Sequence, residues 1–241
     1  MKLVVAALFV GLLSSIAVKA QDDASLIAAE PGMHQMTLPE SERRYTLVIP
    51  DEYTGQEPTP LIMSLHYGGV VTPFYGRGLL QSLVEPAFRE LGAIIVAPDS
   101  DAGSWANPTS DQHVLELLDY IEAHYNIDTN RTLLTGYSMG ASGTWYLAPR
   151  HPERFKAALA MAGRPQADST TFDWKTPLYL ISSKADEVVP LEVTQHAVEQ
   201  LKNKGAPIDL VLLDEITHYE IPQYGPYLRA AIPWIQRVWA E

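Results

Sequence analysis

Residues 135–140, Thr-Gly-Tyr-Ser-Met-Gly, constrain this chain more than any other stretch, because they match the pattern G-x-S-x-G with its serine at position 138. Residues 131–135, Arg-Thr-Leu-Leu-Thr, predict a buried strand before the motif, and residues 141–148 predict a helix after it. A serine at such a sharp strand-to-helix turn is held in a strained conformation, with its hydroxyl exposed above the sheet. The motif therefore predicts that Ser138 is a nucleophile; the simpler alternative is a serine in a glycine-flanked turn.

The rest of the chain alternates short apolar runs with amphipathic segments. This alternation predicts an α/β fold, with a mainly parallel central sheet and helices on both faces. Residues 21–36 show no clear period and are expected to form a lead-in. The predicted strands are 43–50, 61–65, 93–97, 131–135, 155–161, 177–182 and 208–213. The predicted helices are 79–91 (kinked at Pro86), 110–125 (capped by Ser110 or Asp111), 141–148, 193–201 and 227–239.

The N-terminus is typical of a secretory signal peptide. Lys2 gives a positive start, residues 3–13 are apolar, and Val-Lys-Ala at 18–20 is a small-residue cleavage site. The apolar run is shorter than the roughly 20 residues of a membrane span, although a buried first helix or an anchor is the alternative. We therefore expect a signal peptide at 1–20, one catalytic domain at 21–241, a secreted or periplasmic location and no stable membrane anchor after cleavage.

Charge and cysteine content narrow the class of protein. The formal net charge is −12, and it becomes −14 without residues 1–20, which hold Lys2, Lys19 and no acidic residue. This acidic balance argues against nucleic acid as a partner. The chain has no cysteine, which excludes disulfides, a thiol nucleophile and cysteine-based metal sites. No metal or organic cofactor is expected, and the oligomeric state is left open.

A serine nucleophile needs a base and an orienting acid, and in this architecture the chain order is serine, acid, histidine. His218 follows the predicted strand 208–213 and is the expected base. His196 lies inside a helix and His151 in a turn, so both are weaker candidates. Asp186 follows the strand 177–182 and is the expected acid, in preference to its neighbour Glu187 and to Asp214 at the end of the histidine's own strand.

An oxyanion hole requires two backbone N–H groups. Met139, directly after the nucleophile, supplies one, and the loop after the strand 61–65 supplies the other. Within this loop, His-Tyr-Gly-Gly at 66–69, we expect the N–H of Tyr67 to point to the oxyanion. His66 is expected to form hydrogen bonds inside the loop and not to act as a second base.

These pieces in this order resemble the α/β-hydrolase superfamily over roughly residues 40–240. Residues 125–131, Gly-Thr-Trp at 143–145, Pro98-Asp99 followed by Trp105, and residues 151–155 make the chain most similar to two groups of small esterases within it. One is the phospholipase/carboxylesterase group, and the other is the feruloyl-esterase and polyhydroxybutyrate-depolymerase-like group. The resemblance implies a serine carboxylesterase without a cofactor. Tyr67 departs from the glycine that these families often carry, which puts the pocket size in question.

Residues 162–175, the longest spacer after the motif, are too few for a large lid domain. An open site is therefore expected, with Tyr67, Trp105 and Tyr137 in the substrate pocket. Further aromatic residues in its wall are expected among Phe74, Tyr75, Trp145 and Trp174, although core packing is the preferred interpretation for Trp145. Export and an aromatic cleft favour feruloyl or acetyl esters of plant cell-wall material. The alternatives are a serine peptidase of the prolyl-oligopeptidase type, which usually carries an extra gating domain, and a non-catalytic binding protein on the same fold.

Overall fold

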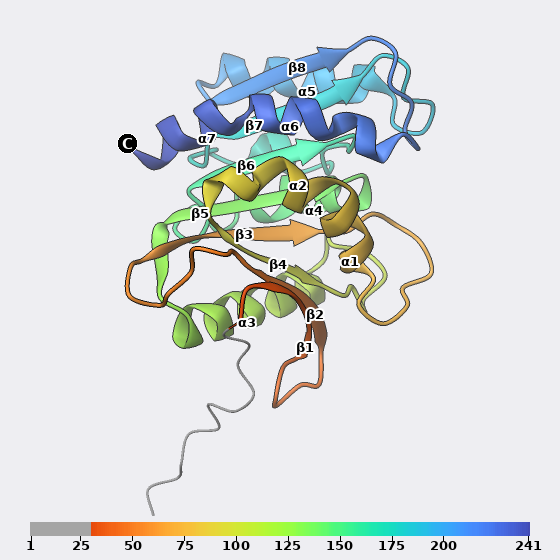
Figure 1. The fold of residues 1–241 in the computed structure, drawn as a ribbon. Coiled ribbons are helices and arrows are strands. Elements are labelled where there is room, and N and C mark those ends of the chain that lie inside the picture. Colours follow the sequence, from red (N-terminus) through yellow and green to blue (C-terminus); the bar gives the residue numbers. More distant parts are fainter. Residues whose placement is uncertain (1–29) are drawn as a thin grey trace, which may run out of the picture.

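The computed structural model describes residues 30–241. The signal peptide predicted at residues 1–20 lies outside this range. Within it, the chain folds around one twisted sheet whose strands run in the order β1-β2-β4-β3-β5-β6-β7-β8 (Figure 1). These strands are β1 (Gly32–Thr37), β2 (Arg44–Ile49), β3 (Thr59–Leu65), β4 (Ile94–Pro98), β5 (Ile127–Tyr137), β6 (Ala157–Met161), β7 (Leu178–Ser183) and β8 (Ile208–Leu213).

The sheet is mainly parallel, as predicted. Strands β3 to β8 pair in parallel, and β2 pairs antiparallel with both β1 and β4. The central strands β3, β4 and β6 are buried along their whole length. Strands covered on both faces must be apolar throughout, and the continuous apolar runs in the sequence reflect this burial.

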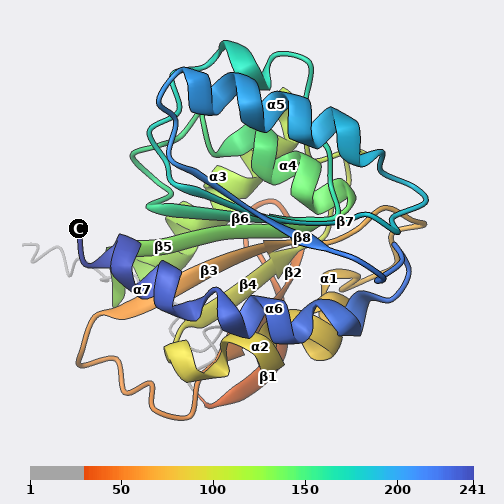
Figure 2. The same ribbon diagram turned by 90° about the horizontal axis from the view of Figure 1, so that it is seen from above.

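Helices cover both faces of the sheet (Figure 2). On one face lie α3 (Pro108–His124), α4 (Met139–Leu147) and α5 (Leu191–Asn203). The other face is covered by α1 (Gly76–Leu79), α2 (Glu85–Phe88), α6 (Gly225–Ala230) and α7 (Ile232–Trp239). Each face buries its own hydrophobic cluster, the first around Trp145 and the second around Phe88 and Leu228. The predicted α/β class is therefore confirmed.

The predicted lead-in is wrong over its last residues, because residues 32–37 form the edge strand β1. Its exposure alternates only weakly, so neither face is apolar enough to leave a period in the sequence. The strand is defined by backbone pairing with β2, from Gly32 opposite Ile49 to Thr37 opposite Arg44. Pairing of this kind depends on the partner and leaves little trace in the local sequence.

Proline explains two differences among the helices. The predicted helix 79–91 starts earlier, at Gly76, and changes form along its length. A π-helical turn η2 (Leu80–Val84) precedes Pro86, and a 3-10 turn η3 (Arg89–Leu91) ends the segment. The predicted helix 227–239 is divided into α6 and α7 two residues before Pro233, whose missing N–H cannot complete a continuous helix.

The amino end of α3 also differs from the prediction. The cap is Asn107, whose Oδ1 accepts a hydrogen bond from the Ser110 N–H at 2.9 Å, and not Ser110 or Asp111. Pro108 occupies the first helical position, where its missing N–H costs nothing.

The segment between β6 and β7 leaves the carboxyl ends of the strands without an inserted lid domain. Between β6 and β7 the only regular element in the described structure is the 3-10 turn η4 (Ser169–Thr171), so no lid domain is inserted there.

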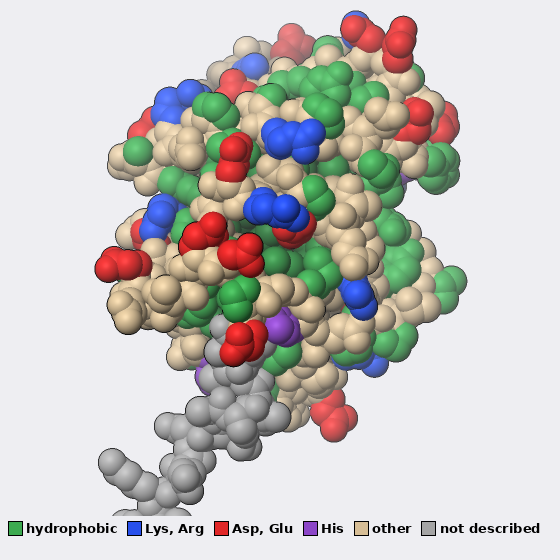
Figure 3. Space-filling model, in the orientation of Figure 1, with side chains coloured by type: hydrophobic (Ala, Val, Ile, Leu, Met, Phe, Trp, Pro, Cys, Tyr) green, Lys and Arg blue, Asp and Glu red, His purple; other side chains and the backbone are tan. Residues whose placement is uncertain are grey.

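Among residues 30–241, no helix has the length and apolar character needed to span a bilayer. Acidic and basic side chains are interspersed on the face seen in Figure 3, which carries no broad basic stripe.

Candidate active site

Ser138 occupies the strained turn that the sequence predicts. β5 ends at Tyr137 and α4 begins at Met139, and Ser138 between them has φ 53° and ψ −111°. This conformation is rare for a residue with a side chain, and it is retained only where the surrounding structure enforces it. The Ser138 N–H donates to the Met161 carbonyl on β6 at 2.9 Å, which fixes the turn to the neighbouring strand.

The motif's two glycines allow the close approach of strand and helix. A Cβ at Gly140 would lie 1.9 Å from the Leu65 carbonyl oxygen at the end of β3, and a Cβ at Gly136 would lie 2.3 Å from the Gly140 backbone. Both distances are far below van der Waals contact with backbone atoms. Glycine is therefore required at both positions for α4 to pack against the sheet.

Ser138, His218 and Asp186 are brought together from three strand ends. The Nε2 of His218 lies 2.9 Å from Ser138 Oγ, and its Nδ1 lies 2.9 Å and 3.1 Å from the two carboxylate oxygens of Asp186. A carboxylate only accepts hydrogen bonds, so Nδ1 carries the ring proton and Nε2 accepts the Ser138 hydroxyl. This is the tautomer that a base for Ser138 requires.

The other candidates lie elsewhere in the molecule. His151 lies 2.6 Å from an Asp111 carboxylate oxygen on α3, and His196 contacts Gln200 on the exposed side of α5. Asp214 pairs with Lys184 at 2.6 Å. None of the three takes part in the contacts of Ser138.

The loop after β7 uses two adjacent acids for different tasks. Asp186 Oδ1 accepts the N–H groups of Val188 at 2.9 Å and Val189 at 2.8 Å, which fixes the carboxylate toward the imidazole. Glu187 Oε2 accepts the backbone N–H of His218 at 3.0 Å. Sequence reasoning set Glu187 aside and missed this contact, because nothing in the local sequence indicates a bond to a backbone 31 residues away.

Tyr137, directly before the nucleophile, binds the same histidine from the other side. Its hydroxyl donates to the His218 carbonyl at 2.7 Å, and the ring packs edge-on against Tyr224. Burial raises the pKa of the Tyr137 phenol, so the group stays protonated and can donate. The peptide groups on both sides of the His218 Cα are therefore held, one by Glu187 and one by Tyr137.

Replacing Tyr137 by phenylalanine is expected to lower kcat about tenfold with little change in KM, because a loosened base is displaced from Ser138 while the substrate hollow is untouched. The buried His218 carbonyl would lose its partner, which costs about 1–2 kcal/mol of unfolding free energy. Steady-state kinetics and urea denaturation measure both. Tyr53→Phe is the matched control, because the Tyr53 hydroxyl accepts the Asn126 N–H away from the site. An equal loss of kcat in both variants would contradict a positioning role.

The predicted oxyanion donors lie on loops that meet beside Ser138. A Cβ at Gly68 would lie 3.7 Å from the Met139 Cβ, so the loop after β3 lies against the start of α4. Within residues 30–241, the N–H groups of Tyr67 and Met139 have no hydrogen-bond acceptor. Both groups are therefore available to a ligand oxygen, and their role in an oxyanion hole stays a prediction.

His66 fixes the conformation of this loop, as expected. Its Nε2 accepts the Ser100 N–H at 3.0 Å, and its Nδ1–H donates to the Tyr67 carbonyl at 2.7 Å. The Trp105 indole donates to the His66 carbonyl at 2.8 Å. Burial lowers the pKa of His66 below its ordinary value, and the neutral ring is also the form that these two bonds require.

This arrangement predicts a loss of stability in acid. Unfolded His66 takes up a proton as the pH falls below about 6.5, and the folded ring resists protonation, so the unfolding free energy decreases below that pH by up to about 1.4 kcal/mol per pH unit. Urea denaturation between pH 7.5 and pH 5 measures the slope. His66→Gln is expected to have a shallower slope than the wild type, whereas His196→Gln on the exposed side of α5 is expected to keep it. Parallel curves for all three proteins would contradict the prediction.

A polar hollow of about 390 Å³ opens over Ser138. Its lining combines hydroxyl, amide and guanidinium groups with two valines, and consists of Ser104, Ser138, Met139, Ser142, Arg164, Gln166, Val188 and Val189. Arg164 is the charged member of this set. No signal in the sequence singles out Arg164, Ser142 or Gln166, because only folding brings the loops after β6 and β7 over the nucleophile.

The prediction that Trp105 and Tyr137 line the substrate pocket is wrong. Trp105 and Tyr137 are each 1% exposed and belong to the hydrophobic core, and neither lines the hollow. The core packing preferred for Trp145 is confirmed, and Trp174, one of the expected wall residues, packs against it in the core. Tyr67 is half-buried against Tyr75 and is also absent from the wall. Trp105 and Tyr137 are buried because each donates a hydrogen bond to a backbone carbonyl of a loop at the site. The acceptors are the carbonyls of His66 and His218.

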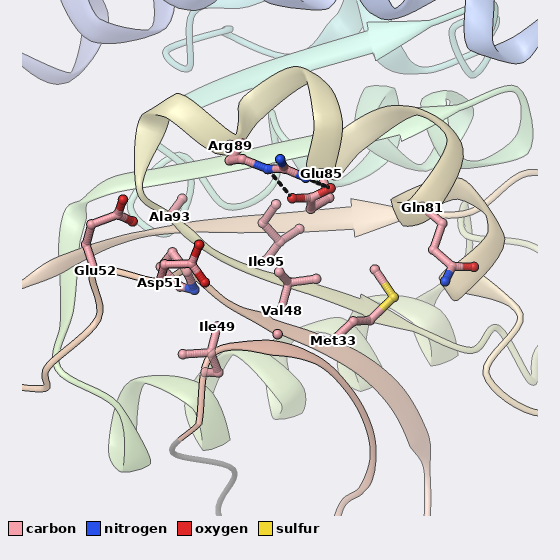
Figure 4. A pocket seen from close by; sticks show the side chains of 12 residues that line it. Met33, Val48, Ile49, Asp51, Glu52, Gln81, Glu85, Arg89, Ala93 and Ile95 are labelled. Atoms are coloured by element: carbon pink, nitrogen blue, oxygen red, sulfur yellow. Dashed lines mark hydrogen bonds and ion pairs between the residues drawn. The ribbon is translucent and has the colours of Figure 1, made fainter.

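A larger hollow, about 580 Å³, lies at the opposite end of the sheet, where β2 ends and β4 begins (Figure 4). Met33, Val48 and Ile95 form an apolar floor, and the ion pair between Arg89 and Glu85, at 2.7 Å, lies along one side. Ser138, His218 and Asp186 do not line this hollow. The described residues also contain no group of three His, Asp or Glu side chains placed to hold a metal ion.

The sequence of this chain is similar to those of known esterases. The family model described as a putative esterase matches residues 37–197, which include Ser138 and Asp186. A probable feruloyl esterase C of Aspergillus niger is 28% identical over 144 residues, which cover 55% of this chain and 49% of the fungal protein. The chain thus spans about half the length of the curated relatives it matches.

Solved structures share the architecture. A thermostable esterase superposes with a TM-score of 0.68 at 22% identity, over 85% of this chain and 62% of its own. A ferulic acid esterase superposes with a TM-score of 0.67 at 18% identity, over 86% of this chain and 97% of its own. At these identities the likeness establishes the α/β-hydrolase fold, and the predicted fold class is confirmed.

Proposed function

Because the chain belongs to the putative esterase family, we propose that it is a serine carboxylesterase that hydrolyses esters through an acyl-enzyme, with Ser138, His218 and Asp186 as catalytic residues. The observation that carries this proposal is the continuous relay from Asp186 through His218 to Ser138 Oγ, with both imidazole nitrogens within 2.9 Å of a partner. Each member is held by an independent backbone constraint, so the relay exists before any ligand binds.

In the proposed reaction, His218 Nε2 accepts the hydroxyl proton while Ser138 Oγ attacks the ester carbonyl carbon. The N–H groups of Met139 and Tyr67 donate to the oxyanion of the tetrahedral intermediate. His218 then protonates the leaving alkoxide, and the alcohol departs. Water attacks the acyl-enzyme with its proton passing to the same nitrogen, and collapse of the second intermediate returns Ser138 and releases the acid.

Feruloyl or acetyl esters of plant cell-wall material are the proposed substrates, and export to the periplasm or the medium is the proposed location. The named relatives support the feruloyl substrate. The aromatic pocket expected from the sequence gives it no support, because Trp105 and Tyr137 are buried. The signal-like residues 1–20 support export, and residues 21–241 are proposed to form one catalytic domain. The open carboxyl edge of the sheet would admit an ester attached to a polymer.

The test uses residues 21–241 with p-nitrophenyl acetate, butyrate and octanoate, methyl ferulate, and a p-nitroanilide as the amide control. Treatment with a fluorophosphonate followed by mass spectrometry locates the reactive serine. Ester hydrolysis with the adduct on the Ser138 peptide is the expected result. Anilide cleavage in place of ester cleavage would favour a peptidase. A folded protein that hydrolyses nothing and carries no adduct would favour a binding protein.

A further inference from the structure

Arg164 brings a positive charge to the hollow over Ser138. Its backbone position is fixed by Gly163, where a Cβ would lie 2.8 Å from the Ser138 carbonyl oxygen and 2.3 Å from the Ala141 Cβ. The segment after β6 therefore passes directly against the turn that carries the nucleophile. Arg164 follows this contact, its side chain is exposed, and it lines the same hollow as Ser138.

The guanidinium of Arg164 has no partner among residues 30–241, although acidic side chains are close in the sequence. Asp168, four residues later, forms an ion pair with Arg150 at 2.5 Å. Arg154 is likewise satisfied, by Asp119 at 2.7 Å. An arginine offers a planar set of donors that matches a carboxylate, and here the arginine lines the hollow over Ser138 without a partner for this set.

The overall charge of −12 opposes the approach of anions, but this repulsion acts at long range. Salt screens charges beyond roughly 8–10 Å at physiological ionic strength, so a contact inside the hollow is decided by the nearest charge. Within the lining that charge is Arg164, with neutral hydrogen-bonding groups from Ser142 and Gln166 beside it. A ligand anion at this position meets one cation and no lining carboxylate.

We propose that Arg164 selects esters that carry a carboxylate close to the ester bond, such as esters of sugar acids or half-esters of dicarboxylic acids. This inference rests on the proposed esterase function and narrows its substrates to acidic esters, in place of the neutral feruloyl esters that the relatives suggest. The carboxylate pairs with the guanidinium while the ester carbonyl lies at Ser138, so that charge and reacting carbon are bound together. Arg164 is a specificity-determining residue in this role.

The test measures kcat/KM for two matched pairs of esters. Mono-4-nitrophenyl fumarate and its methyl ester differ by a charge on the acyl side, and the trans double bond keeps the carboxylate from attacking its own ester. 4-Carboxyphenyl acetate and its methyl ester, followed by release of the phenol, differ on the alcohol side. The ratio of charged to capped ester is compared between proteins, so that intrinsic reactivity cancels.

In at least one pair, Arg164→Gln is expected to lower this ratio about fivefold, because a partly exposed charged pair contributes on the order of 1 kcal/mol. Arg164→Lys is expected to be intermediate, since it keeps the charge without the paired donors. Raising NaCl to about 0.5 M is expected to reduce the wild-type ratio. The matched control is Arg237→Gln, on α7, because it removes the same charge at the far end of the sheet (Figure 1).

Unchanged ratios in Arg164→Gln for both pairs, with hydrolysis of the capped esters intact, would overturn the inference and leave the esterase function standing. An equal decrease in Arg237→Gln would also overturn it, because the effect would then belong to the net charge. Hydrolysis of none of the four esters by the wild type would overturn the proposed function and this inference together.

Discussion

Replacing Ser138 by alanine is expected to lower kcat for ester hydrolysis by about 10⁵- to 10⁶-fold, to the level at which only binding and oxyanion stabilisation remain. In the proposed mechanism the Oγ atom forms the covalent bond of the acyl-enzyme, and no other hydroxyl lies within reach of His218 Nε2 among the contacts of the described residues. The change removes one atom from a position set by backbone geometry, so the fold is expected to be retained.

The measurement compares kcat on p-nitrophenyl butyrate for the wild type, Ser138→Ala and Ser142→Ala. Ser142 lines the same hollow without contacting the imidazole, so its loss is expected to change kcat by less than about tenfold. Circular dichroism and thermal unfolding check that all three proteins fold alike. A Ser138→Ala protein that kept a tenth of the wild-type rate would exclude the acyl-enzyme mechanism.

The proximity of Ser138, Asp186 and His218 could be predicted from sequence because each residue carries a local signature. Ser138 lies in a five-residue motif that only glycine at 136 and 140 makes possible, and Asp186 and His218 each follow a short apolar strand. Parallel topology then places all strand ends at one edge of the sheet. Chain order and strand order together therefore leave few alternatives to Asp186 and His218 as the partners of Ser138.

The surroundings could not be predicted, because they depend on contacts between distant segments. The Tyr137 side chain points into the core and reaches the His218 carbonyl, 81 residues later, whereas the sequence favoured a pocket residue. Trp105 is likewise an anchor for the His66 carbonyl. Aromatic residues near a motif are equally consistent with a wall and with a support beneath it, and only the folded chain distinguishes the two.

Half of the hollow's lining comes from two irregular segments, which supply Arg164 and Gln166 after β6 and Val188 and Val189 after β7. Neither has a periodic pattern, and their relative position follows from the crossover through β7 and the packing of α5. Sequence reasoning therefore reaches the chemistry of the site but not the chemistry of its ligand. Arg164 enters the proposed substrate class only because the folded chain places it in the same hollow as Ser138.

Asp186→Asn is expected to lower kcat by about 10⁴-fold while leaving the fold intact, and the hydrogen bonds around Asp186 give the reason. Oδ1 accepts two backbone N–H groups, from Val188 and Val189, so the amide oxygen of asparagine will occupy that side. The amide NH₂ then takes the place of Oδ2, 2.9 Å from His218 Nδ1. Because this group can only donate, Nδ1 must become an acceptor, and the ring proton moves to Nε2.

With a proton on Nε2, His218 cannot accept the hydroxyl proton of Ser138, although all heavy atoms stay in place. Nitrogen-15 NMR of the imidazole is expected to show protonated Nδ1 in the wild type and protonated Nε2 in Asp186→Asn, alongside the loss of kcat. Glu187→Gln is the control, because its amide oxygen can still accept the His218 N–H. A large loss of kcat in Asp186→Asn without the tautomer change would mean that the charge of Asp186, and not its hydrogen-bond geometry, governs the base.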